Sequence, residues 1–191
     1  MFGIVMFAGG SIFAVVAPDF TVFLIGRAAQ GKQSHFNLET PFDASLYSIM
    51  GITIVIVTVT AIILLIYLLV TRLNLAPHLA LALRMGLFIS IIGSVIGGYM
   101  AGNNRHTVGG QDGGEGLFFL NWSTLLGDLR VPHFFGLHAL QLIPLITYLV
   151  TLRVKSPSRK LWISWIVSLL YLGFVGFSFI QAAQGQPFIG K

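Results

Sequence analysis

Long runs of apolar residues alternate with polar segments along this chain, and each run is long enough to cross a bilayer as a helix. Roughly 20 residues span the hydrocarbon core. The runs occupy residues 2–26, 44–70, 79–100, 132–152 and 161–182. A lone segment in lipid must satisfy its own backbone, which leaves helix as its one stable form. The pattern therefore predicts an all-α fold, a polytopic transmembrane helical bundle of about five spans.

The first run, residues 2–26, is too long for a cleaved signal peptide and lacks the basic start of one. Two longer polar segments, residues 27–43 and 101–131, separate the runs. The second is rich in glycine but also contains Phe118, Phe119 and Trp122, which a solvated linker does not need. We therefore expect it to be ordered and to lie on the membrane surface. All 191 residues are expected to form a single transmembrane domain.

Composition supports a membrane protein. Hydrophobic residues make up 55% of the chain and charged residues 9%, whereas a soluble domain carries roughly 25% charged residues. There is no cysteine, which excludes disulfides, thiolate catalysis and Cys-ligated metal centres. The basic residues are scattered at the ends of apolar runs and form no dense patch, so nucleic acid is not expected as a partner. The expected partners are membrane lipid and either other membrane subunits or a second copy of the chain.

The charges also predict an orientation. The turns after the second and fourth runs, together with the start of the third run, carry basic residues without acidic ones: Arg72, Arg84, Arg153, Lys155, Arg159 and Lys160. Such segments face the cytoplasm, which places the N-terminus inside. The acidic residues and most histidines then lie toward the outer face: Asp19, Glu39, Asp43, Asp112, Glu115, Asp128, His35, His106, His133 and His138. Chemistry is expected on that side.

Asp19, inside the first run, is the most unusual residue for its position. A carboxylate in hydrocarbon faces the bundle interior or a water-filled cavity in almost every case. Counting at ~1.5 Å per residue from the outer boundary puts Asp19 and His138 at similar depths. We predict that they meet, with Asp19 raising the pKa of the imidazole or fixing its tautomer. A competing interpretation is that Asp19 bonds a backbone donor freed by Pro18.

The outer histidines are candidate metal ligands: His35, His106, His133 and His138. His133 and His138 point about 140° apart on a helix and cannot share one ion, whereas His138 shares a face with Phe134 and Gln141. A metal site would therefore combine segments. Three His with an Asp would suit zinc or iron, and a facing pair would suit haem b. The competing interpretation is that each histidine is a hydrogen-bonded structural residue.

The segment before the fourth run offers a third kind of site. Asp128 is a candidate catalytic residue, together with Asp19 and His138. Arg130 lies just before the helix that is expected to begin at Pro132, where free backbone N–H donors attract anions. The candidate substrate-binding or anion-binding residues are Arg105, Arg130, Asp112, Trp122 and Gln141. The alternative is that salt bridges, from Asp128 to Arg130 or from Asp112 to Arg105, merely fasten the loop.

Several short motifs carry a resemblance: SHFN at 34–37, TPFD at 40–43, HTVG at 106–109, DGG at 112–114, NWST at 121–124 and GDLRVPHFFGLH at 127–138. They resemble the blocks of a family of bacterial polytopic membrane proteins without a settled activity. The resemblance implies a bacterial inner-membrane location and, because that family tends to have further spans, a short member or a fragment. A looser likeness is to haem A synthase, which also sets a glycine-rich outer loop before a helix opening with histidine; its paired His-Arg signatures are missing here.

Three functions remain open from the sequence. The first is a site near the outer face that binds a metal ion or haem for redox or hydrolytic work on a lipid-soluble substrate. The second is a proton-coupled or ion-coupled transporter or channel subunit, in which Asp19 and His138 relay charge. The third is a structural or assembly subunit whose outer loop docks another protein.

Overall fold

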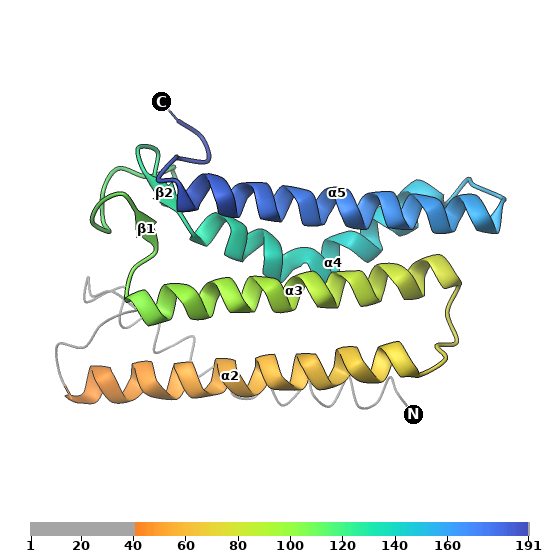
Figure 1. Ribbon diagram of the computed structural model, residues 1–191, viewed down its shortest axis with the longest axis horizontal. Coiled ribbons are helices and arrows are strands. Elements are labelled where there is room, and N and C mark those ends of the chain that lie inside the picture. The colour runs from red at the N-terminus through yellow and green to blue at the C-terminus, as the bar shows by residue number, and fades with distance from the viewer. Residues whose placement is uncertain (1–40, 191) are drawn as a thin grey trace. The chain divides into compact units, whose positions relative to one another are not determined.

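The computed structural model describes residues 41–190 of the chain, apart from a few side chains near the start of the first described helix. The elements, shown in Figure 1, are α2 (Pro41–Val70), α3 (Pro77–Asn103), β1 (Thr107–Val108), β2 (Gly127–Asp128), α4 (Arg130–Thr151) and α5 (Pro157–Ala183). The chain divides into two compact units, Met1–Met50 and Gly51–Lys191, so α2 begins in one unit and ends in the other.

Four helices are long and apolar enough to cross a membrane: Tyr47–Val70, Pro77–Asn103, Arg130–Thr151 and Pro157–Ala183. They confirm four of the predicted helical runs, with ends that differ by a few residues. The chain is therefore a multi-pass membrane protein. The first predicted span, residues 2–26, lies outside the described residues, as does most of the segment 27–43.

Prolines and polar caps set the helix ends. Pro77 and Pro157 begin α3 and α5, where the missing proline N–H costs nothing. Asn104 ends α3 in the left-handed conformation, with φ of 50°. The helix α4 begins at Arg130, two residues before the expected start at Pro132. The backbone N–H of Arg130 donates to Asp128, which precedes the helix. Pro132 still falls in the first turn, where its missing donor is tolerated.

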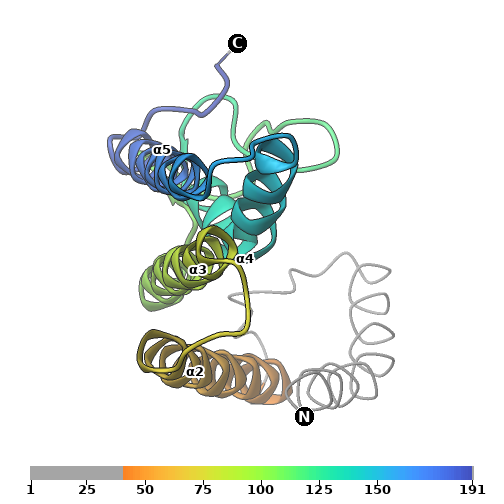
Figure 2. The same ribbon diagram turned by 90° about the vertical axis from the view of Figure 1, so that its right-hand side faces the viewer.

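Helices α3, α4 and α5 pack together as a bundle, seen along their axes in Figure 2. Its apolar core is made of small and branched side chains: Ala82, Ile89, Ile96, Ala139, Ile143 and Val175. Gly93 of α3 faces Gly136 of α4 so closely that a Cβ atom built on Gly136 would lie 2.6 Å from the Gly93 Cα atom. The absence of side chains at these two glycines thus permits a close contact between the helices.

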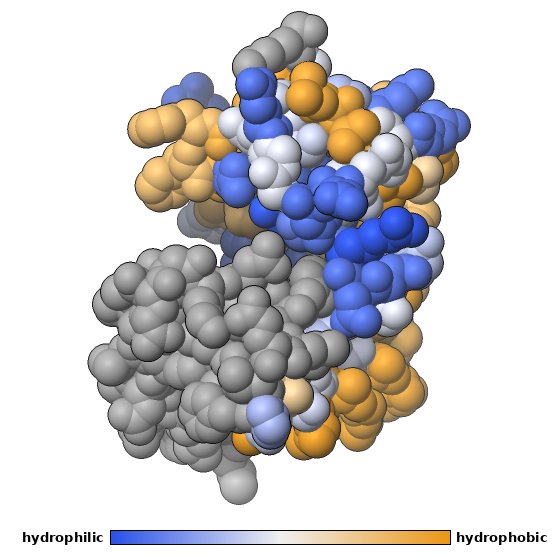
Figure 3. Space-filling view, turned by 90° about the vertical axis from the view of Figure 1, so that its left-hand side faces the viewer, coloured by the Kyte–Doolittle hydropathy of each residue, from blue (hydrophilic) through white to orange (hydrophobic). Residues whose placement is uncertain are grey.

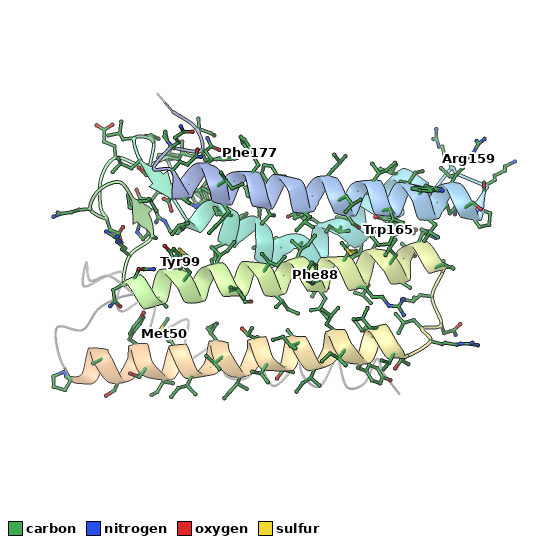
Figure 4. The ribbon with its side chains drawn as sticks, in the orientation of Figure 1. Met50, Phe88, Tyr99, Arg159, Trp165 and Phe177 are labelled. Carbon is green, nitrogen blue, oxygen red and sulfur yellow. The ribbon has the colours of Figure 1, made fainter. Side chains whose placement is uncertain are left out.

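The outward faces of the helices are apolar as well. Phe88 of α3 and Trp165 of α5 lie along the shafts of their helices with 42% and 40% of their surface exposed, and Arg159 stands at one end of α5 (Figure 4). Exposed apolar surface on this scale would be a liability in water, whereas lipid accepts it. The side-chain pattern fits helices that are surrounded by hydrocarbon.

Candidate functional site

Residues 104–129, between α3 and α4, form a folded segment that we call the cap. Its two strands pair antiparallel, with Thr107 opposite Asp128 and Val108 opposite Gly127. Gly127 lies against the backbone carbonyl of Ala182 in α5, and a Cβ atom at this position would collide with that oxygen. The cap is therefore joined to the ends of the bundle helices by direct backbone packing as well as by the chain itself.

A buried carboxylate is the centre of the cap. Asp128 is 1% exposed and accepts the backbone N–H groups of Ser123, at 2.9 Å, and Arg130, at 3.0 Å. The Arg130 guanidinium donates to both carboxylate oxygens, with Nη2 at 2.7 Å and Nε at 3.0 Å and 3.2 Å, and it also donates to the backbone carbonyl of Asn121. The predicted salt bridge between Asp128 and Arg130 is thus confirmed.

His106 lies between two carboxylates. Its Nε2 atom is 3.5 Å from Asp112, and its Nδ1 atom is 3.6 Å from Asp128. Asp112 in turn accepts the backbone N–H groups of Thr107 at 2.8 Å and of His106 at 3.2 Å. Asp112 therefore pairs with His106 rather than with Arg105, the partner that the sequence suggested. We refer to His106, Asp112, Asp128 and Arg130 as the Asp128 cluster.

Hydrogen bonds and charge decide the ionisation of both carboxyls. Burial raises the pKa of Asp128, but hydrogen bonds from His106, Arg130 and Ser123 and the Arg130 charge outweigh burial and hold that pKa well below its usual range. Burial also raises the pKa of Asp112, and hydrogen bonds from Thr107 and His106 more than offset it, so the net shift is downward. Both groups are therefore carboxylates at neutral pH.

The carboxylate oxygens of the Asp128 cluster are all used by hydrogen-bond donors of the cap and of Arg130. Both oxygens of Asp128 and both of Asp112 already accept hydrogen bonds, and the Arg130 guanidinium is used by Asp128 and Asn121. A cation would have to displace these donors beside a fixed positive charge, and an anion would have to compete with Asp128. Within residues 41–190, no group of three or more His, Asp or Glu side chains is arranged to hold a metal ion. The geometry of the Asp128 cluster suits a fastening role.

The two histidines of α4 share a different arrangement. His133 lies 2.8 Å through Nδ1 from the carbonyl oxygen of Gly93, and its ring packs against Gly97 of α3. His138 lies 2.9 Å through Nδ1 from the carbonyl oxygen of Phe134, one turn earlier in its own helix. A carbonyl oxygen can only accept, so Nδ1 carries the proton in both rings. In the neutral imidazole Nε2 is then an unprotonated nitrogen with a free lone pair.

His138 lies on the exposed surface of α4. Its ring stacks on the Phe134 ring with 4.2 Å between centroids, and Gln141 is exposed on the same helix. The predicted sharing of a face between His138 and Phe134 is confirmed. No other described side chain bonds the Nε2 atom of His138. A polar group at this place within a helix long enough to cross the bilayer needs a partner other than lipid.

Trp122, a predicted binding residue, packs against other aromatic rings. It is 8% exposed, and its ring lies 5.6 Å from that of Phe134 and 6.0 Å from that of Phe135, measured between centroids. Phe188, in the segment after α5, adds a third contact at 6.3 Å. This aromatic cluster fastens the cap to the start of α4.

Some predicted site residues are not brought together, and some contacts were not foreseen. Asp19 and His35 lie outside the described residues, so their meeting with His138 stays a prediction. His106 and His138 belong to separate environments, the cap and the helix face. Sequence reasoning missed the roles of Ser123 and Phe188, because a backbone donor and a packing contact leave no signal in residue type or spacing.

No protein-family model, curated protein or solved structure matches the chain.

Proposed function

We propose that this multi-pass membrane protein uses His138 as a ligand for a metal ion or haem b, in redox or hydrolytic chemistry on a lipid-soluble substrate. The observation that carries the proposal is the fixed tautomer of His138 on an exposed helix face. Its Nδ1–H donates to the Phe134 carbonyl, which leaves the Nε2 lone pair available. Histidines that bind metals are held in this way in most proteins, through a second hydrogen bond that orients the ring.

The remaining ligands and the location of the site are proposed from the sequence. His138 needs further ligands from another segment. Asp19, at a similar depth in the bilayer by residue counting, or His35, from the outer segment 27–43, would supply them. The positive-inside rule puts the cap and His138 toward the outer face of a bacterial inner membrane. The motif resemblance to a bacterial membrane family supports that location. The bound group would supply Lewis acidity or an electron, while Phe134 and Gln141 would orient the substrate beside it.

The exposed polar face of α4 also favours a second function. His138 and Gln141 could bond a polar group on another transmembrane helix, since such bonds hold helices together in lipid. That helix would belong to another subunit, to a second copy, or to the first apolar run of this chain. An assembly subunit would use the face in this way, and a proton relay would use it if the partner were Asp19.

The purified protein tests the proposal directly. We expect a Soret band or a stoichiometric metal in protein extracted under mild conditions, and its loss in His138→Gln. His106→Gln is the matched control and should keep the bound group, because His106 is already paired with two carboxylates. Melting temperature and monodispersity show whether each variant is folded.

Two results would contradict the metal-site proposal. One is a wild-type protein isolated without metal or haem. The other is a folded His138→Gln variant with the full complement. Proton or ion flux in proteoliposomes, lost in Asp19→Asn and His138→Gln, would then identify the transporter function. A stable complex with another membrane protein, disrupted by His138→Gln, would identify the assembly function.

A further inference from the structure

The cap has one strongly exposed apolar feature, a tight hairpin. Gly116 and Ser123 form an antiparallel bridge, and the backbone N–H of Leu117 donates to the carbonyl of Trp122 at 2.8 Å. Phe118 and Phe119 stand at the tip with 98% and 94% of their surface exposed. Two fully exposed phenylalanines side by side are unusual, since burying each would be favourable. We call residues 117–122 the aromatic hairpin.

Backbone hydrogen bonds close the tip of the hairpin. The N–H of Asn121 donates to the carbonyl of Leu117 at 2.8 Å, and that of Leu120 donates to the carbonyl of Phe118 at 3.0 Å. Phe119 is held at φ of 75°, a conformation that is costly for a bulky side chain. The hairpin thus holds both rings outward instead of letting them fold back onto the cap.

The base of the aromatic hairpin is fixed at the start of a membrane helix. The Arg130 side chain donates to the carbonyl of Asn121, and the Trp122 ring packs on Phe134. Arg130 is the first of 22 residues in α4, and 22 residues at ~1.5 Å each are about 33 Å long, close to the ~30 Å hydrocarbon thickness. The base of the hairpin therefore lies near the membrane boundary.

Chain length limits how far the tip can be from that boundary. Phe119 is two residues from Asn121 and Phe118 is three. At ~3.5 Å per residue, the backbones of these two residues lie at most about 7 Å and 10 Å from the Asn121 carbonyl, which Arg130 holds. The headgroup layer on each side of a bilayer is about 5–7 Å thick, so both rings are within reach of lipid.

The absence of charge and the exposure of neighbouring apolar side chains both indicate contact with lipid. Residues 113–129 contain two ionisable side chains, Glu115 before the hairpin and the buried Asp128 after it, so residues 116–127 carry no charge. Leu120, within the hairpin, and Leu125, just after it, are exposed as well, with 43% and 57% of their surface accessible. Apolar side chains at the edge of this end of the structure are visible in Figure 3.

We propose that the aromatic hairpin is an interfacial anchor, with Phe118 and Phe119 inserted into the headgroup region of the bilayer that the helices cross. The anchor fixes the depth and the tilt of α4 through the hairpin's contacts with Arg130 and Phe134. It acts independently of what His138 binds. The proposal is that lipid, and not another protein, contacts the two rings.

The absence of cysteine gives a clean test, because one introduced cysteine can be labelled uniquely. The full chain with Phe118→Cys or Phe119→Cys is labelled with an environment-sensitive fluorophore and reconstituted into vesicles of phosphatidylethanolamine and phosphatidylglycerol. Gln111→Cys, exposed elsewhere in the cap, is the matched control. We expect blue-shifted emission at positions 118 and 119, with at least about twofold stronger quenching by shallow spin-labelled lipid than at position 111.

Two outcomes would overturn the proposal. Aqueous iodide that quenches the labels at 118 and 119 as strongly as the label at 111 would place the hairpin in water. Labels shielded from both iodide and spin-labelled lipid would mean that protein, such as a second copy, covers the tip. Phe118→Cys and Phe119→Cys should each melt in detergent like the wild type, because neither ring packs inside the cap, so that a loss of quenching cannot be blamed on unfolding.

Discussion

Gly93 of α3 and Gly136 of α4 lie backbone to backbone where the two helices cross. A Cβ atom built on Gly93 would be 2.6 Å from the Leu137 backbone nitrogen, and one on Gly136 would be 2.6 Å from the Gly93 Cα atom. The same crossing brings the Gly93 carbonyl within 2.8 Å of the His133 Nδ1 atom. Close approach therefore serves both packing and the fixing of a histidine tautomer.

Gly136→Ala should force the two helices apart, because the Cβ atom would meet backbone rather than a flexible side chain. Overpacking of this kind costs about 1–3 kcal/mol. The measurement is the melting temperature in detergent micelles. Gly98→Ala is the control, since a Cβ atom at Gly98 meets nothing within 4 Å. Equal melting temperatures for both variants would show that the crossing tolerates a larger separation.

Asp128→Asn should loosen the cap while leaving the helices formed. Removing one charge of a buried pair costs about 3–5 kcal/mol, and we expect the lower end because asparagine keeps one acceptor oxygen. Faster hydrogen exchange is expected at the backbone amides of Ser123 and Arg130, which donate to Asp128. Arg105→Gln removes an exposed charge of the same segment and should leave this exchange unchanged. Unaltered exchange in Asp128→Asn would refute a fastening role.

The pH dependence of the cap follows from the lowered pKa values of Asp112 and Asp128. A carboxyl whose pKa is lower when folded binds protons less tightly in that state, so its contribution to stability is present above the unfolded pKa of about 3.9 and is lost below it. Cap stability should be flat between about pH 7 and 5 and should fall below about pH 4. Asp128→Asn should show a shallower fall. A decline that begins near neutral pH would point to another group.

Arg84 of α3 should stabilise the turn that follows α2. Its Nε atom donates to the carbonyl of Leu68 at 2.8 Å, and its Nη2 atom donates to that of Thr71 at 3.2 Å. Arg84→Gln loses the charge-assisted bonds, which are worth about 1.5–3 kcal/mol. We expect a lower melting temperature in lipid nanodiscs. Arg72→Gln, in the same turn but exposed, should change it little, and an equal drop in both would mean that only the net charge matters.

The two histidines of α4 show what residue spacing can predict and what it cannot. The five-residue separation of His133 and His138 correctly predicted that they would face different surroundings, because the angle per residue in a helix is fixed. It did not predict what each Nδ1 atom bonds. For His133 that partner is a carbonyl 40 residues away, which depends on the crossing of α3 and α4.

The sequence by itself determined the spans in the described part of the chain, since the bilayer demands helices of about 20 apolar residues and leaves few alternatives. It also determined that the described ionisable residues of the cap and the basic residues of the turn from α4 to α5 lie at opposite ends of α4. Tertiary structure alone decided that His106 lies between Asp112 and Asp128 and that Phe118 and Phe119 face outward. Those contacts depend on turns and on hydrogen bonds between backbone and side chain, whose geometry residue types and spacing do not specify.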